Sequence, residues 1–157
     1  MKLTDCFEPN AVIVDLKSRE RNGVIRELVS SLVSSGAIRA EHEETLARAL
    51  IQRENQGSTG FGKGVAVPHV KHEVVQSISL TVGRSIAGID FAALDRAPVY
   101  IVFVLLSPED KPDDHLAAME TVFKYLQRDN FRKFLRQAET QEEIIELIGE
   151  ADDASDD

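Results

Sequence analysis

The stretch that organises the chain is Gly57-Ser58-Thr59-Gly60-Phe61-Gly62-Lys63-Gly64-Val65-Ala66-Val67-Pro68-His69-Val70-Lys71. Its glycines allow positive φ angles and let another group approach the backbone closely. Exposed N–H groups in such a loop form a concave site for an anion. Pro68 fixes its own φ and favours an extended Val67, so His69 follows the loop at a stiff position. An imidazole beside such a nest suits a phosphoryl acceptor, although a glycine-rich loop is also an ordinary turn.

Composition places the chain among globular proteins. Its 157 residues indicate one domain, and the hydrophobic content of 43% is large enough for a core. The net charge of −9 gives no indication of nucleic-acid binding, which favours a basic surface. Cys6 is the only cysteine, so the chain forms neither an internal disulfide nor a cysteine cluster for a metal. The N-terminus lacks the apolar region of a signal peptide, and Val99–Leu106 is too short to span a bilayer. We therefore expect a cytoplasmic protein without direct membrane insertion.

Acidic residues gather at the C-terminus. Five of the 27 acidic side chains lie in residues 150–157, and without them the net charge is −4. A short run of like charge is typical of a solvated, disordered end. We expect a domain over residues 1–149 and a disordered acidic tail over residues 150–157.

Before the glycine loop, the pattern predicts one strand and two helices. Val12–Leu16 is short and β-branched, which favours a strand. Apolar residues at helical spacing follow from Val24 to Val33, with Ser18 as an N-cap and Gly36 at the end. A second helix is expected over 40–55, with Arg53 on the same stripe as Leu46, Ala49 and Leu50. A cation at a helix C-terminus is ordinary, but a guanidinium on an apolar stripe favours an anion partner.

After the loop, strands are expected over 65–67, 78–82 and 99–106. The last is a nearly continuous apolar run, as in a central strand buried on both faces. Helices then begin at Pro112, at Asp129 and after Thr140, which forms a capping box with Glu143. The core positions expected for the first two are Leu116, Met119, Phe123 and Leu126, then Phe131, Phe134 and Leu135. Helices on either side of the strands in the chain predict an α/β domain with a sheet covered on both faces.

His115 opens the helix that begins at Pro112. It aligns with Ala118, Met119 and Val122, so it borders the apolar face. A helix N-terminus disfavours an imidazolium, and we expect this side chain to remain neutral.

Three other kinds of site match parts of this region poorly. Gly57-x-x-x-x-Gly62-Lys63 nearly matches the nucleotide-binding P-loop, but Gly64 replaces the Ser or Thr that binds Mg²⁺, and the loop leads from a helix into a strand. His69, His72 and His115 offer three metal ligands, but Lys71 brings positive charge between the first two. The chain has no Gly-x-Ser-x-Gly elbow of a hydrolase. His72 and His42 are interpreted as polar surface residues.

The run from Arg53 to Lys71, together with Asp114-His115-Leu116, resembles the enzyme IIA component of the bacterial phosphotransferase system. The resemblance is to the fructose/mannitol-type branch, nearest to its nitrogen-regulatory subgroup, and covers nearly the whole chain. It implies the mannitol-type enzyme IIA fold, a single α/β/α domain with a mixed sheet. Val70 departs from the glycine that is frequent there, which predicts narrower access to His69. Phe61 replaces a more usual aliphatic residue and is expected only to pack.

The resemblance also implies roles for individual residues. His69 is the implied phosphoryl acceptor, His115 orients the phosphoryl group, and Arg53 stabilises its charge. No metal or cofactor is implied. The donor is the phosphorylated histidine of a small phosphocarrier protein. The implied phosphate-binding loop comprises Gly57, Ser58, Thr59, Gly60, Gly62 and Gly64.

Two uses of the phosphoryl group stay open. A nitrogen-type regulator changes its binding to a target protein, whereas a sugar-transport relay passes the group to an enzyme IIB component. We expect regulation, since the sequence contains no fused B domain, carrier domain or transmembrane part. A protein-interaction module that works without phosphate is a third possibility.

Overall fold

The computed structural model describes residues 1–155. Its centre is β5 (Val99–Pro108), whose residues are all buried except the half-buried Tyr100. β4 (Ser79–Ile89) runs antiparallel along one edge of β5. β2 (Val65–Ala66) and β3 (His69–His72) run parallel along the other, and β1 (Gly60–Gly62) pairs antiparallel with β2. The sheet is therefore mixed, and the prediction of a central buried strand is confirmed.

β2 and β3 behave as one strand interrupted at Pro68. Val65 lies opposite Ile101 and His69 opposite Leu105, which is the same offset along β5. Proline has no N–H to donate to the ladder, but the carbonyl of Pro68 still accepts a hydrogen bond of 3.0 Å from the Leu105 N–H. The break places His69 at the first residue of β3, on the outer edge of the sheet.

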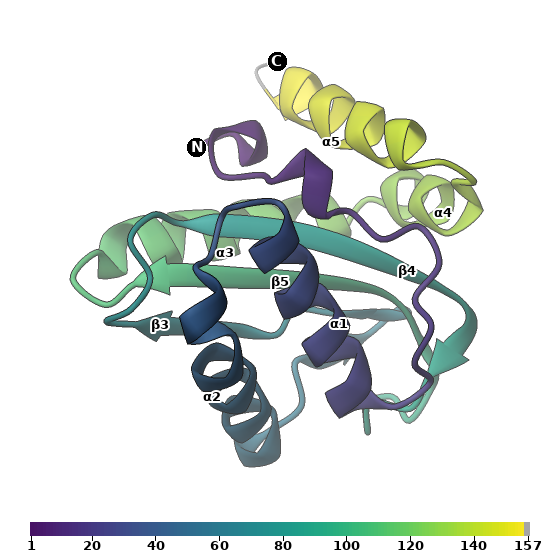
Figure 1. The fold of residues 1–157 in the computed structure, drawn as a ribbon. Helices are drawn as coiled ribbons and strands as arrows, with labels where there is room; N and C mark the ends of the chain where they lie inside the picture. The colour runs from purple at the N-terminus through teal and green to yellow at the C-terminus, as the bar shows by residue number, and fades with distance from the viewer. Residues whose placement is uncertain (156–157) are drawn as a thin grey trace.

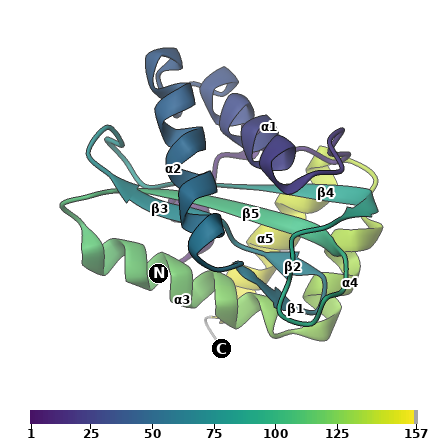
Figure 2. The same cartoon turned by 90° about the horizontal axis from the view of Figure 1, so that it is seen from below.

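Helices cover both faces of the sheet (Figure 2). α1 (Arg21–Ser34) and α2 (Glu43–Gln56) lie on one face, and α3 (Pro112–Leu126) lies on the other with α4 (Asp129–Gln137) and α5 (Gln141–Ser155). Side chains alternate along β5: Phe103 joins the core beneath α3, and Val102 and Val104 join the core beneath α1 and α2. The predicted α/β fold with helices on both faces is confirmed.

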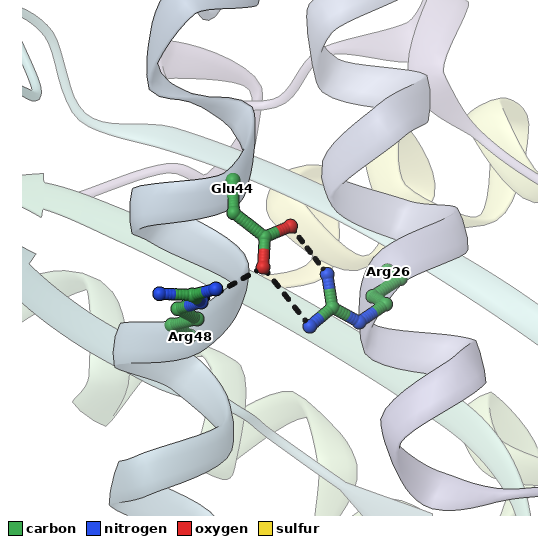
Figure 3. A network of polar contacts seen from close by, with 3 residues as sticks. All are labelled: Arg26, Glu44 and Arg48. Carbon is green, nitrogen blue, oxygen red and sulfur yellow. Dashed lines mark hydrogen bonds and ion pairs between the residues drawn. The ribbon is translucent and has the colours of Figure 1, made fainter.

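An exposed ion-pair network joins α1 to α2 (Figure 3). The Glu44 carboxylate accepts hydrogen bonds from Arg26 at 2.7 and 3.3 Å and from Arg48 at 2.9 Å. These bonds lower the pKa of Glu44, Arg26 contributing most. Exposed pairs of this kind contribute little stability, so the buried stripes of the two helices must hold them together.

The N-terminal segment differs from its prediction. Val12–Leu16 follows a 3-10 helix, η2 (Pro9–Ala11), and is not a regular strand, because a single isolated bridge, from Ile13 to Gly83, joins it to β4. The Ile13 N–H donates to Val82 O at 3.1 Å, so the segment follows β4 without a continuous ladder. α1 begins at Arg21 rather than after Ser18, whose hydroxyl instead accepts a hydrogen bond from the Glu20 N–H. Gly36 ends the helix as predicted, with φ of +87°.

Two predicted core positions on the C-terminal helices are wrong. Leu116 is 57% exposed and Phe134 is 46% exposed. The buried stripe of α3 instead includes His115, Ala118 and Val122, one step around the helix. The capping interaction after Thr140 is confirmed on one side, since its hydroxyl accepts a hydrogen bond from the Glu143 N–H at 3.2 Å.

The expected disordered tail is wrong for residues 150–155, which continue α5; Asp156 and Asp157 lie outside the described residues. This end of α5 is held in place by Asp152, whose side chain is only 2% exposed. Its carboxylate accepts hydrogen bonds from the N–H groups of Leu3 and Thr4, at 2.8 and 2.9 Å, and from the Tyr125 hydroxyl. These bonds hold η1 (Leu3–Asp5) against α5, and the N-terminus lies beside the last helix in Figure 1. Within residues 1–155, every helix is too short or too polar to cross a bilayer.

Candidate phosphohistidine site

His69 and His115 face one another across the edge of the sheet. Their ring centroids are 5.6 Å apart and the rings are tilted by 41°. His69 comes from the first residue of β3 and His115 from the first turn of α3, on the face that α3 covers. The spacing leaves room for a phosphoryl group on one ring with an oxygen within reach of the other.

The His69 ring has a defined tautomer. Its Nδ1 lies 2.7 Å from the Val67 carbonyl oxygen. A carbonyl only accepts hydrogen bonds, so Nδ1 carries the proton and Nε2 keeps its lone pair. Burial lowers the pKa of His69 and the Arg53 charge adds to this, while the Val67 bond and Glu54 act in the opposite direction. The pKa is held below 6.5, so the ring is neutral at pH 7 with Nε2 as its nucleophilic atom.

His115 is a buried, neutral imidazole. Its Nδ1 lies 2.6 Å from the hydroxyl oxygen of Ser107, a fully buried residue of β5. Burial lowers the pKa of His115 to about 4, and the charges of His69 and Lys71 act in the same direction. The predicted neutrality is confirmed, but its main cause is burial rather than the helix terminus.

Arg53 lies at the C-terminal end of α2. Its Nη1 donates a hydrogen bond of 2.8 Å to Gly57 O, its only hydrogen-bond partner among residues 1–155. The other guanidinium N–H groups are available to an anion, and the charge is near enough to lower the pKa of His69. The expected stripe is partly wrong: Leu46 and Leu50 are buried with Ala47 and Glu54, while Ala49 and Arg53 lie at its border.

Three amides of the glycine loop, in which a nest of free N–H groups is expected, already make hydrogen bonds. The Gly57 N–H donates to Glu54 O, the Thr59 N–H to the Glu54 carboxylate, and the Gly60 N–H to the Ser58 hydroxyl oxygen. The Ser58 hydroxyl itself donates to Phe91 O at 2.9 Å. These three loop N–H groups are therefore engaged within the loop and its flanking helix, and Arg53 and His115 are the side chains that can add to anion stabilisation at His69.

Gly62 and Gly64 lie away from His69. They form the turn between β1 and β2 with φ of +111° and +77°, which glycine adopts without strain. The Gly64 carbonyl accepts hydrogen bonds from Tyr100 and Ile101, whereas His69 lies opposite Leu105. At about 3.3 Å per residue, Gly64 is about 16 Å from His69 along the strand.

Glu54 is a residue that the sequence prediction missed. It is 2% exposed, and its carboxylate accepts hydrogen bonds from both the N–H and the hydroxyl of Thr59. The Thr59 hydroxyl oxygen in turn accepts a bond of 3.2 Å from the Val67 N–H, and the Val67 carbonyl holds His69. The sequence did contain a signal for Glu54: its carboxylate lies about two helical turns after Leu46, on the buried stripe of α2.

The two departures near His69 have simple structural consequences. Val70 packs into the core on the α1 and α2 face, whereas His69 faces α3, so the expected narrowing beside His69 is wrong. Phe61 packs against Phe123 with ring centroids 5.0 Å apart, as expected.

His69 and His72 lie three residues apart on a strand and so face opposite sides. Among residues 1–155, no group of three or more His, Cys, Asp or Glu side chains is arranged to hold a metal ion.

Comparison with known proteins identifies one family. Residues 5–151 match the family model described as phosphoenolpyruvate-dependent sugar phosphotransferase system, EIIA 2. The fructose-specific EIIABC component of Bacillus subtilis is 33% identical over 152 residues, which cover 97% of this chain but only 24% of that protein. The nitrogen regulatory protein of Pseudomonas aeruginosa is 33% identical over 148 residues, 94% of this chain and 95% of that protein. The crystal structure of IIA-Ntr from Neisseria meningitidis has a TM-score of 0.83 at 24% identity, covering 93% of this chain and 98% of that chain.

Proposed function

The chain belongs to the EIIA 2 family of the phosphoenolpyruvate-dependent sugar phosphotransferase system, a family of phosphotransfer components, and from this premise we propose that it carries the phosphoryl group on Nε2 of His69. The observation that supports this most directly is the hydrogen bond from Nδ1 to the Val67 carbonyl, which leaves the Nε2 lone pair free at neutral pH. The donor is the phosphorylated histidine of a phosphocarrier protein.

The transfer is a displacement at phosphorus. The Nε2 lone pair forms the new N–P bond while the donor's P–N bond breaks and its electron pair returns to the donor imidazole. Such transfers depend on positioning and on stabilisation of charge on the phosphoryl oxygens. Arg53 supplies positive charge with free N–H donors. The Nδ1 of His115 lies 2.6 Å from the Ser107 hydroxyl, and in the tautomer whose Nδ1 accepts from that hydroxyl, the Nε2–H can donate to a phosphoryl oxygen.

The loop acts as a scaffold for these groups. Glu54 and Thr59 fix Val67, whose carbonyl sets the orientation and tautomer of His69. A preset geometry lowers the barrier because reacting groups need not be ordered during the reaction.

Regulation is the proposed use of the phosphoryl group, within the cytoplasm. The nitrogen regulatory protein of P. aeruginosa matches over 95% of its length, and the phosphorylation state of His69 would control binding to a target protein. The similarity to a fructose-specific EIIABC component favours a second candidate, a transport relay that passes the group to an enzyme IIB component. Transfer from the labelled chain to an isolated enzyme IIB would support the relay.

The test is labelling by a phosphorylated carrier. We expect no labelling of His69→Ala, while His115→Ala still accepts the group but transfers it onward poorly. His72→Ala is a matched control, because His72 is a half-buried histidine of the same strand, and it should label like the parent chain. Full labelling of His69→Ala would remove the proposal. Absence of labelling in every variant and in the parent chain would instead indicate an interaction module that works without phosphate.

A further inference from the structure

A cleft of about 800 Å³ lies between the β1–β2 turn, the start of β5 and α4. Figure 2 shows these elements together at one end of the sheet. None of His69, His115 and Arg53 lines it, and Gly64, which does, is about 16 Å from His69 along the strand at about 3.3 Å per residue. The cleft is therefore separate from the proposed phosphohistidine site and does not depend on it.

The cleft is positively charged in a chain of net charge −9. Four cations line it, Lys63, Arg132, Lys133 and Arg136, against two carboxylates. One carboxylate, Asp129, is paired with Arg132. The other, Asp95, accepts hydrogen bonds from the backbone N–H groups of Lys63 and Ala97, at 3.3 and 3.0 Å. The acidic groups are thus engaged locally, and the surplus charge is positive.

Among residues 1–155, three of these cations, Lys63, Lys133 and Arg136, have no anionic partner. The Arg136 guanidinium stacks on the Tyr100 ring, 3.8 Å from its centroid, which fixes its orientation. Among residues 1–155, neither Arg136 nor Lys133 makes a side-chain hydrogen bond or ion pair. Lys63 makes only a long contact of 3.4 Å with Gln127. The cleft therefore presents one oriented guanidinium and two ammonium groups.

We propose that this cleft binds a small phosphate ester. A guanidinium can donate to two phosphate oxygens at once. The nearby ammonium groups add charge that favours a doubly negative phosphate ester over a ligand with one carboxylate. The exposed Pro98 and the half-buried Tyr100 give an apolar wall for the organic part. The volume lies within the range of about 300–1,000 Å³ that is usual for small-molecule sites. Sugar phosphates and nucleotides share this chemistry.

The test is titration of the ¹⁵N-labelled full chain, followed by amide NMR. The probes are fructose 6-phosphate and AMP, each paired with fructose or adenosine, and inorganic phosphate. We expect saturable shifts in residues 63–64, 97–100 and 129–137 with at least one ester, weaker shifts with phosphate, and none with fructose or adenosine. Affinity should fall as salt is raised, because exposed charges are screened.

Substitution distinguishes the cleft from the rest of the surface. Lys133→Gln and Arg136→Gln should each weaken ester binding about tenfold, the loss of roughly one charge-assisted hydrogen bond. Lys133 is exposed, so its variant tests the proposal even if Arg136→Gln disturbs Tyr100. Arg19→Gln removes an exposed cation that does not line the cleft, and this variant should bind like the parent chain.

Several results would overturn the proposal. The first is the absence of saturable shifts with both esters up to about 10 mM, a concentration that would reveal even weak small-ligand binding. The others are equal binding of adenosine and AMP, and unchanged affinity in both cleft variants. Equal affinity for phosphate and both esters would show an anion site without an ester preference. Shifts only with an acidic peptide would show a protein-docking surface instead.

Discussion

At the scale of the residue, the protonation of His115 can be measured directly. With a pKa of about 4 in the folded chain against an ordinary 6.5, the unfolded state binds more protons between these values. Folding stability should therefore fall as pH drops from about 6.5 toward about 4, and His115→Asn should lose this part of the pH dependence. NMR of the imidazole carbons should show His115 titrating near pH 4. A midpoint near 6.5 would contradict the buried, neutral ring.

The Thr59 hydroxyl is a second residue with a measurable role. In Thr59→Val, the Glu54 carboxylate and the Val67 N–H each lose a buried partner, which should cost about 1–3 kcal/mol per group left unsatisfied. Thr59→Ser keeps the hydroxyl and is the matched control. In urea unfolding, Thr59→Ser should be more stable than Thr59→Val. Labelling of Thr59→Val by the phosphorylated carrier should also be slower, because Val67 orients His69. Equal stability of the two variants would show that the network is unimportant.

At the scale of the element, Asp152 joins the last helix to the N-terminus. Burial acts to raise the pKa of its carboxyl, but the bonds from Tyr125, Thr4 and Leu3 outweigh it and hold the pKa below 3.8. The stability that Asp152 contributes is fully present above the pKa of the unfolded state and is lost as pH falls through the lower pKa of the folded state. The pH dependence due to Asp152 should therefore appear below about pH 4. Asp152→Ala should lower the free energy of unfolding by about 1–3 kcal/mol or more.

Asp153→Ala is the control for Asp152→Ala, because Asp153 is exposed one residue further along α5. Its stability should match that of the parent chain, since a single exposed charge contributes little. If the two variants unfold at the same urea concentration, α5 does not hold η1 through this carboxylate.

Local patterns were sufficient for some elements and insufficient for others. The buried strand β5 and the presence of the α2 helix were predicted from the sequence, because burial on both faces and amphipathic spacing are properties of neighbouring residues. The bridge of Ile13 to β4 and the bonds of Asp152 to Leu3 join distant segments and leave no local pattern. The role of His69 as phosphoryl acceptor stays a prediction, whereas the engagement of the Thr59 N–H by the buried Glu54 carboxylate left no local signal in the loop itself.

At the scale of the whole molecule, the two cores fix the distance between the proposed catalytic groups. The core beneath α3 positions His115, while α2, packed on the other face, carries Arg53 in its last turn. His69 lies between them on β3, half-buried, where a second protein can reach it. The sheet edge therefore places His69 between the other two groups, and the Glu54–Thr59–Val67 chain of hydrogen bonds sets its orientation.

The nitrogen that carries the phosphoryl group tests the central claim most directly. The chain, labelled with ¹⁵N in its histidines and phosphorylated by the carrier, would be examined by ¹⁵N and ³¹P NMR. The hydrogen bond from Nδ1 to Val67 predicts a single N–P bond on Nε2 of His69. A phosphoryl group on Nδ1 of His69, or on any other histidine, would contradict the account.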